Sequence, residues 1–382
     1  MSKVFVSYNN IVSAYGLNSN AAVSQIEKEV SSLKHTVDEG ILPYPFFTSR
    51  LENKRISEAF EQLKASEAFT RLEQLMTISL SKVIAESGIK LNKRVGLIIS
   101  TTKGNIDVLE ETSPHPKERS YLSVLGAQVK SFFGFQNDAL ILSNACVSGV
   151  LAIAVAKRFI AQGAYDHVFV VGGDLVTKFI LSGFNAFQAL SNEPCRPYCK
   201  TRTGINIGEV AACALVTNDE NKLAKEAVEI LGASSCNDAN HISGPSRTGE
   251  GLYQSIQTAL HQAKISAADI DHVSGHGTAT QFNDEMESIA FNRTGLKDVP
   301  MNSLKGYFGH TLGASGLLET IVGMHSLHRN TLFANKGYLE LGVSKPLNII
   351  KRTTPATLRT FLKTASGFGG CNTAAIFKKV CE

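Results

Sequence analysis

Hydrophobic and polar positions divide the chain into two kinds of segment. Short apolar runs rich in β-branched residues are separated by longer stretches with helical periodicity, which is typical of an α/β protein with parallel strands. The runs show little alternation between apolar and polar residues, as expected where both faces of a sheet are covered. The predicted strands are 95–100, 139–142, 167–171, 210–216, 228–233, the segment before residue 276, 301–303 and 374–380.

Two short patterns recur in the two halves of the chain. The helix start Ser-Gly-Val-Leu at 148–151 has a counterpart in Ser-Gly-Leu-Leu at 315–318. The glycine pair at 172–173, after one predicted strand, has a counterpart at 369–370. On their own these patterns only suggest an internal duplication.

A cysteine lies between one predicted strand and an alanine-rich helical pattern. Cys146 follows the apolar run 139–142 and comes just before the helix start at Ser148. A thiol at a helix N-terminus feels the positive end of the helix dipole and unpaired N–H groups, and both favour the thiolate. The same N–H groups can hold an oxyanion on a bound acyl group. A free cysteine is more often a small buried apolar residue, so Cys146 needs support from elsewhere in the chain.

Two glycine-rich histidine motifs provide that support. His276 lies in Gly-His-Gly-Thr-Ala-Thr at 275–280, and His310 lies in Phe-Gly-His-Thr-Leu-Gly at 308–313. The glycines allow a tight turn and the close approach of a ligand. A lone histidine is usually structural, but the order Cys, His, His, each in its own polar turn, indicates one catalytic site.

These motifs resemble those of the elongating β-ketoacyl-acyl carrier protein synthases of the thiolase superfamily. Initiating synthases of that superfamily have a Cys-His-Asn set in place of Cys-His-His. The second histidine, at 310, therefore favours resemblance to the elongating type. The resemblance covers most of the chain, including 183–191, Arg-Pro-Tyr at 196–198, Arg-Thr-Gly at 202–204, Gly-Glu at 208–209, Asp-Ala-Asn-His at 238–241 with Gly-Pro at 244–245, and Gly-Phe-Gly-Gly-Cys-Asn at 367–372.

The resemblance implies a fold and a division of the chain. The fold is the duplicated thiolase fold with five layers, α/β/α/β/α. The N-terminal half, residues 1–225, would carry the nucleophilic cysteine, and the C-terminal half, residues 226–382, would carry both catalytic histidines. The recurring helix starts then mark equivalent positions in the two halves.

The same resemblance implies an acyltransferase that performs a decarboxylating Claisen condensation. Cys146 would hold the acyl chain, while His276 and His310 would stabilise the enolate that forms when malonyl-acyl carrier protein loses carbon dioxide. The backbone N–H groups of Cys146 and Phe368 would form the oxyanion hole. The product is 3-oxoacyl-acyl carrier protein, in fatty-acid-like or type II polyketide or polyene biosynthesis. Substrates arrive on the phosphopantetheine of the carrier, so no cofactor and no metal are expected.

Further residues take roles by the same resemblance. Lys305 belongs to the catalytic set and would pair with Glu319 close to the histidines. Without the surrounding motif, they would be interpreted as a surface lysine and an exposed helical glutamate. Thr278 and Thr280 would bind the phosphopantetheine arm, although threonine hydroxyls in turns also bond the local backbone.

Two acidic residues and one loop complete the predicted site. Asp284 and Glu287 are expected to orient the loop that carries the first histidine, without taking part in the reaction. Phe368 and Gly369 are expected to contact the substrate.

Composition places few further limits on function. The chain has 382 residues, of which 43% are hydrophobic and 19% charged, close to globular averages. A net charge of +4 gives no indication of nucleic acid binding. Seven cysteines without a pairing pattern favour a reducing compartment, so we expect a cytoplasmic protein. Neither an apolar leader nor a stretch able to span a bilayer is visible, and Cys195 and Cys199 have no second pair at a metal-binding spacing.

The expected partners are an acyl carrier protein and a second synthase-type subunit. That subunit is either a second copy of this chain or a ketosynthase-like paralogue, giving a homodimer or a heterodimer. Lys64, Lys200 and Arg202 are candidates for docking the acidic carrier. For Arg202 we favour a buried ion pair with Glu209.

Departures from the family pattern favour a specialised pathway over housekeeping fatty-acid synthesis. Ser366 stands where many relatives have Phe, Gly275 where Ala is common, Val210 where Gly is usual, and Gln188 where an arginine often helps to bind the carrier. None of these departures affects Cys146.

Three other classes of protein fit the sequence less well. A chain-length-factor-like partner subunit would lack the nucleophilic cysteine. A cysteine hydrolase leaves the second histidine motif unexplained. A degradative thiolase would carry a second catalytic cysteine near its C-terminal glycine motif, where Cys371 does lie, but the flanking residues match synthases.

Overall fold

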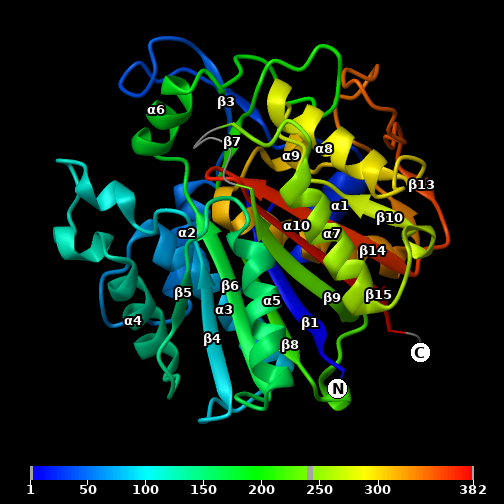
Figure 1. Cartoon of the computed structure of the whole chain (residues 1–382). Coiled ribbons are helices and arrows are strands. Elements are labelled where there is room, and N and C mark those ends of the chain that lie inside the picture. Colours follow the sequence, from blue (N-terminus) through cyan, green and yellow to red (C-terminus); the bar gives the residue numbers. More distant parts are fainter. Residues whose placement is uncertain (1–2, 239–243, 381–382) are drawn as a thin grey trace.

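A computed structural model describes residues 3–238 and 244–380. Residues 239–241 of the motif at 238–241 lie outside this part of the chain. Ten of the described strands form one continuous sheet, in the order β11-β10-β14-β15-β9-β1-β8-β6-β4-β5 (Figure 1).

The sheet consists of two halves with the same pairing pattern. In each half three outer strands run parallel, and two antiparallel pairings follow toward the middle. The strands of the first half are β1 (Phe5–Val12), β4 (Val95–Ser100), β5 (Leu140–Leu142), β6 (His167–Asp174) and β8 (Val210–Thr217). Their counterparts, in the same order, are β9 (Val228–Asn237), β10 (His272–Ser274), β11 (Met301–Asn302), β14 (Thr360–Gly367) and β15 (Cys371–Lys379). The halves join where β1 pairs with β9 through Phe5–Glu229 and Val6–Val228.

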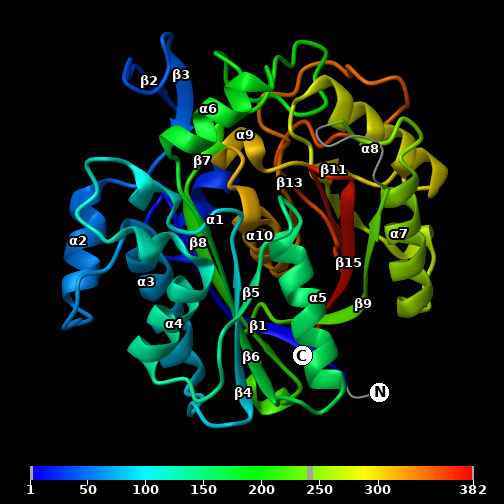
Figure 2. The same ribbon diagram turned by 60° about the vertical axis from the view of Figure 1, so that its left-hand side comes forward.

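Helices cover both faces of each half of the sheet (Figure 2). On one outer side lie α3 (Arg71–Ser87) and α4 (Leu122–Phe133), and on the other lie α7 (Glu250–Ala263) and α8 (Gln281–Arg293). Between the halves lie α5 (Ser148–Ala161) and α10 (Ser315–Arg329). Because α10 is enclosed by both halves, all its residues from 315 to 327 are buried. The order of layers is α/β/α/β/α, which confirms the predicted duplicated thiolase fold.

The remaining elements surround this duplicated core. They are α1 (Ser19–Glu27), α2 (Asn53–Glu61), α6 (Lys178–Ala186), α9 (Lys305–Phe308), a small sheet of β2 (Lys34–Thr36), β3 (Phe46–Ser49) and β7 (Ile207–Gly208), and the pair β12 (Thr331–Leu332) and β13 (Thr354–Pro355). No helix among the described residues is long and apolar enough to cross a membrane.

The recurring Ser-Gly helix starts have a packing explanation. Helices α5 and α10 begin at Ser148 and Ser315, as predicted, and their first turns touch. A Cβ atom at Gly149 would lie 2.5 Å from the backbone nitrogen of Leu317, and one at Gly316 would lie 2.6 Å from that of Val150. Only glycine permits this approach, which brings the chain segments just before the two helices to one place.

The other recurring pattern is not equivalent in the structure. Gly172 and Gly173 lie inside β6, whereas Gly369 and Gly370 form the turn between β14 and β15. Every predicted strand is present, but the sheet is mixed instead of parallel. The prediction missed β1 and β14, since both place polar residues inside the protein, among them Asn10 and Lys363.

Candidate active site

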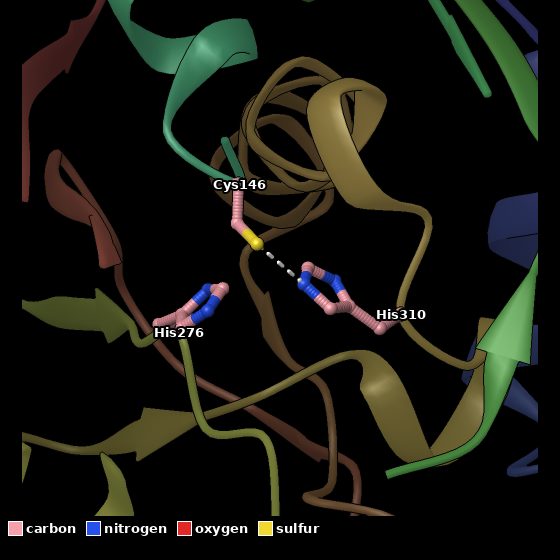
Figure 3. Close-up of side chains that lie close together, drawn as sticks. All are labelled: Cys146, His276 and His310. Carbon is pink, nitrogen blue, oxygen red and sulfur yellow. Dashed lines mark hydrogen bonds between the residues drawn. The ribbon is translucent and has the colours of Figure 1, made fainter. Parts of the chain in front are cut away.

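The cysteine and the two histidine motifs meet at one point (Figure 3). Cys146 lies in the turn before α5, His276 follows β10, and His310 lies between α9 and α10. The Sγ atom of Cys146 is 3.0 Å from Nε2 of His310. The two imidazole rings stand edge to face with centroids 5.2 Å apart. Cys146 and the two histidines, which lie more than a hundred residues further along the chain, therefore form one site.

The turn that carries Cys146 is held by the first residue of α5. The hydroxyl of Ser148 accepts a hydrogen bond of 2.8 Å from the Asn144 N–H and donates one of 2.7 Å to the Ala145 carbonyl. Ala145 takes a φ of +44°, which is strained for a residue other than glycine. Burial raises the pKa of the Cys146 thiol to about 12. The resting group is thus a thiol, because loss of water outweighs the helix N-terminus that was expected to favour a thiolate.

Both histidines are neutral in the resting site. Burial lowers the pKa of His276 and of His310 well below 6.5, and the positive charge of Lys305 acts in the same direction. Nδ1 of His310 lies 3.0 Å from the hydroxyl oxygen of Ser315, which also accepts from the Thr311 N–H at 3.0 Å. The first residue of α10 therefore orients His310, just as the first residue of α5 shapes the turn of Cys146.

A buried ion cluster lies behind His276. Lys305 donates to the His276 carbonyl at 2.5 Å and pairs with Glu319 at 2.8 Å. Lys363, from β14, pairs with the other oxygen of Glu319 at 2.6 Å. The Lys305 and Lys363 side chains are fully buried, so their charges require these partners.

The loop after β10 is held by two carboxylates. Glu287 accepts hydrogen bonds of 2.7 Å and 2.6 Å from the N–H groups of His276 and Gly277. Asp284 accepts one of 3.0 Å from the N–H group of Thr278. Burial raises the pKa of Asp284 to about 7 and also raises that of Glu287. Neither carboxylate lines the cavity at the site, so their contacts orient the loop.

A cavity of about 520 Å³ opens onto the cysteine and the two histidines. Thr278 and Thr280 line it, with their hydroxyl oxygens 2.8 Å apart. Aromatic rings line another part, where Phe368 packs against Phe184 and Phe187 at centroid distances of 5.7 Å and 5.3 Å. A largely apolar cavity with a few polar groups suits a thioester on a flexible arm.

The glycine loop reaches the backbone of the cysteine. A Cβ atom at Gly367 would lie 3.0 Å from the backbone nitrogen of Cys146. Gly369, at a φ of +83°, is also part of the cavity wall. The loop that holds Phe368 is thus packed directly beside the turn of Cys146.

Comparison with known proteins identifies the family. The β-ketoacyl synthase N-terminal domain matches residues 45–222, and the β-ketoacyl synthase C-terminal domain matches residues 227–338. The chain belongs to the β-ketoacyl synthase family. It is 27% identical to 3-oxoacyl-[acyl-carrier-protein] synthase 2 of Vibrio cholerae, over 78% of this chain and 80% of that protein. The protein is therefore an acyltransferase of the 3-oxoacyl-[acyl-carrier-protein] synthase type.

Solved ketosynthases share the fold over the whole chain. A complex of a ketosynthase with its chain length factor from Xenorhabdus doucetiae includes a chain with a TM-score of 0.85 at 24% identity, covering 99% of this chain and 98% of that one. A type II polyketide synthase ketosynthase, bound to a hexaketide and in complex with its acyl-carrier protein, includes a chain with a TM-score of 0.83 at 19% identity, covering 99% and 100%.

The structure of this synthase places most predicted site residues around one cavity. Lys305 and Glu319 are buried and paired, not the exposed residues that their types alone would indicate. Lys363 was missed, because nothing in a strand-like run identifies a lysine as buried. Its only signal is a charge inside an apolar segment.

The prediction for Arg202 was wrong. Its side chain is buried, but it lies 3.7 Å from Asp284 and donates to the Gly342 carbonyl at 2.5 Å. Glu209 pairs with Arg71 instead. Lys200 pairs with Glu340 at 2.9 Å, and neither Lys64 nor Lys200 lines the cavity.

The site atoms are also close enough to reach a single ion. Sγ of Cys146 and one nitrogen from each of His276 and His310 lie within 4.8 Å of one another. Sulfur and imidazole nitrogen are donors that suit zinc. The predicted roles of these groups are those of a nucleophile and of hydrogen-bond donors, and these roles stay predictions, as does the expectation that no metal or cofactor is needed. The proposed boundary between residues 225 and 226 is likewise a prediction.

Proposed function

We propose that the protein condenses an acyl chain held on Cys146 with malonyl-acyl carrier protein, releasing carbon dioxide and forming 3-oxoacyl-acyl carrier protein. One observation carries the proposal. A buried cysteine in contact with a neutral histidine shares a cavity with a second neutral histidine, as two-step acyl transfer requires. Membership of the β-ketoacyl synthase family supports the same reaction.

The first step moves the acyl group from its carrier to the cysteine. Sγ of Cys146 attacks the thioester carbonyl, and its proton passes to Nε2 of His310, 3.0 Å away. The backbone N–H groups of Cys146 and Phe368 would hold the oxyanion. When the carrier thiolate leaves, His310 returns the proton to it, so both histidines are neutral again.

The second step uses both histidines as hydrogen-bond donors. The malonyl thioester loses carbon dioxide, and the enolate oxygen that results is stabilised by the imidazole N–H group of His276 and by His310 in its other neutral tautomer, with the proton on Nε2 and with Nδ1 accepting from the Ser315 hydroxyl. The enolate carbon then attacks the acyl group on Cys146. A carbon–carbon bond forms and the carbon–sulfur bond breaks. The departing Cys146 sulfur takes up one proton from solvent, which is the proton that the loss of carbon dioxide from the malonyl carboxylate consumes. Burial assists this step by keeping water from the enolate.

We further propose that both substrates enter on the phosphopantetheine arm of an acyl carrier protein. Thr278 and Thr280 would contact that arm, since their hydroxyls line the cavity. The pathway would be fatty-acid-like or type II polyketide biosynthesis. No resident cofactor is required, because the carrier supplies the reactive thioester.

The partner subunit would be a second copy or a ketosynthase-like paralogue. The ketosynthase from Xenorhabdus doucetiae forms its complex with a chain length factor, which supports the paralogue. The alternative is that this chain is itself the chain-length-factor-like partner. Its cysteine, in contact with His310, argues against that role.

Incubation with an acylated carrier and malonyl-carrier tests the proposed reaction. The purified chain, alone and co-expressed with its pathway paralogue, should release carbon dioxide and give 3-oxoacyl-carrier by mass spectrometry. Acylation of Cys146 without any condensed product in either preparation would contradict the proposal. Absence of acylation would favour the partner-subunit role.

A further inference from the structure

Three consecutive carbonyl groups before and at His276 accept hydrogen bonds from buried lysines. Lys363 donates to the carbonyls of Ser274 at 3.1 Å and Gly275 at 3.0 Å. Lys305 donates to the carbonyl of His276. No other lysine among the described residues is buried. Hydrogen bonds from buried lysines are therefore confined, in this part of the chain, to residues around 274–276 and Glu319.

A single carboxylate links the two lysines. Glu319, on α10, is 2.8 Å from Nζ of Lys305 through one oxygen and 2.6 Å from Nζ of Lys363 through the other. On the opposite edge of the same backbone, Glu287 accepts from the N–H groups of His276 and Gly277. The chain that carries His276 is thus held from both sides by charged groups.

This arrangement differs from the Lys–Glu pair that the sequence predicts. The pair Lys305–Glu319 is complete without Lys363, and burying a second lysine adds a desolvation cost of its own. Burial lowers the pKa of Lys363, and Glu319 opposes this change. The buried Lys363 ammonium carries a desolvation penalty, and it donates hydrogen bonds to the carbonyls of the two residues before His276. This placement indicates that Lys363 fixes the position of His276.

We propose that Lys363 is a positioning residue that, through Glu319 and together with Lys305, clamps residues 274–276 and so fixes the imidazole of His276 against the substrate. This inference rests on the proposed function for its kinetic consequence, because His276 acts there on the malonyl thioester. Among the described contacts, Lys363 has none with Cys146. In the proposed reaction the acylation of Cys146 depends on His310.

Lys363→Met removes the two carbonyl contacts while keeping side-chain length and leaving the pair Lys305–Glu319 intact. Lys363→Gln keeps an amide donor without the charge. Thr364→Val is the matched control, since Thr364 is the next residue of β14, is equally buried, and points to the other face of the sheet. Thermal melting checks that each variant is folded.

Decarboxylation of malonyl-carrier and acylation of Cys146 are measured separately for each protein. In Lys363→Met decarboxylation should fall by roughly 10- to 100-fold, the scale expected when a reacting group is displaced by about 1 Å. Acylation should stay close to the parental rate, and Lys363→Gln should lie between the two proteins. If both rates fell together, or fell no more than in Thr364→Val, Lys363 would be only structural and the inference would be overturned.

A second readout needs no substrate. In protein with isotope-labelled histidine rings, Lys363→Met should shift the NMR signal of His276 and leave those of His167 and His261 in place. An unshifted His276 signal overturns the inference even if the parental protein does not decarboxylate malonyl-carrier. Failure of the parental protein to decarboxylate, with a shifted signal, would count against the proposed function alone.

Discussion

Nε2 of His310 lies 3.0 Å from the sulfur of Cys146, whereas no hydrogen bond joins His276 to that sulfur among the described contacts. The two histidines are therefore not equivalent, although both belong to the same cavity. His310 can serve both the transfer of the acyl group and the stabilisation of the enolate. His276 can serve only the second.

Replacing the two histidines should separate these roles. His276→Ala should lower malonyl decarboxylation by about 10²- to 10³-fold, as loss of an oxyanion donor does, while Cys146 still accepts an acyl group. His310→Ala should lower both steps, because it also removes the acceptor of the thiol proton. Rapid-quench measurement of acyl-enzyme and of carbon dioxide checks each step. His325→Gln, a buried histidine outside the cavity, is the control. Equal effects of the two alanine variants on acylation would contradict the assignment.

Replacing the nucleophile should stop acyl transfer without unfolding the protein. Cys146→Ala keeps a small apolar side chain in the turn, so melting should change little, but no acyl adduct should appear by intact-protein mass spectrometry. Malonyl decarboxylation should persist, because both histidines remain. Cys236→Ala, a partly exposed cysteine of β9, should be acylated at the parental rate. Condensation by Cys146→Ala would identify another residue as the nucleophile.

Protonation of His272 at acidic pH should lower the free energy of unfolding. This histidine is buried on β10, 3.2 Å from the Asn302 side-chain oxygen, and burial lowers its pKa to about 4. A group with a depressed folded-state pKa contributes stability above its unfolded pKa near 6.5, and that stability is lost as pH falls toward 4. Compared with His272→Gln, the wild-type protein should lose about 3 kcal/mol of unfolding free energy between pH 7 and pH 4. Urea titrations of both proteins across this range give the difference. A difference that stays constant with pH would show that His272 has the same pKa in the folded and the unfolded chain, and would contradict the prediction.

The outer edge of the first half of the sheet should form the subunit interface. β5 ends the sheet there, with Leu140 37% exposed, and an unpaired edge of this kind readily associates with another strand. Leu140→Lys should weaken the dimer by at least about tenfold, since it buries a charge at the contact. Leu339→Lys, at an apolar residue that is 74% exposed elsewhere, is the control. Light scattering at several concentrations, alone and with a co-expressed paralogue, would show a stable monomer if no such interface exists.

Much of this architecture could be predicted, and the exceptions have physical causes. The apolar runs of β4, β6 and β8 and the Ser-Gly starts of α5 and α10 are local signals, so the sequence indicates them directly. The Cys, His and His motifs are local too, and their glycines show where the chain turns.

What the sequence did not indicate depends on contacts between distant residues. Lys363 is buried where it meets Glu319 and the carbonyl groups of Ser274 and Gly275, and none of these lies within forty residues of it along the chain. The predicted ion pair between Arg202 and Glu209 does not form, because Arg71 pairs with Glu209 and Asp284 lies beside Arg202. The resting thiol of Cys146 likewise follows from burial by the far half of the chain.

The place of β1 at the junction of the two half-sheets constrains the order of assembly during synthesis. Its residues Phe5–Val12 pair with β8, and Phe5 and Val6 also pair with Glu229 and Val228 of β9. During synthesis β1 must therefore wait for more than two hundred further residues before either of these neighbours is complete. Contacts so distant in sequence are slow to form. We expect the nascent chain to expose this strand, with Phe5, Val6, Ile11 and Val12, for most of its translation, when a chaperone would be most needed.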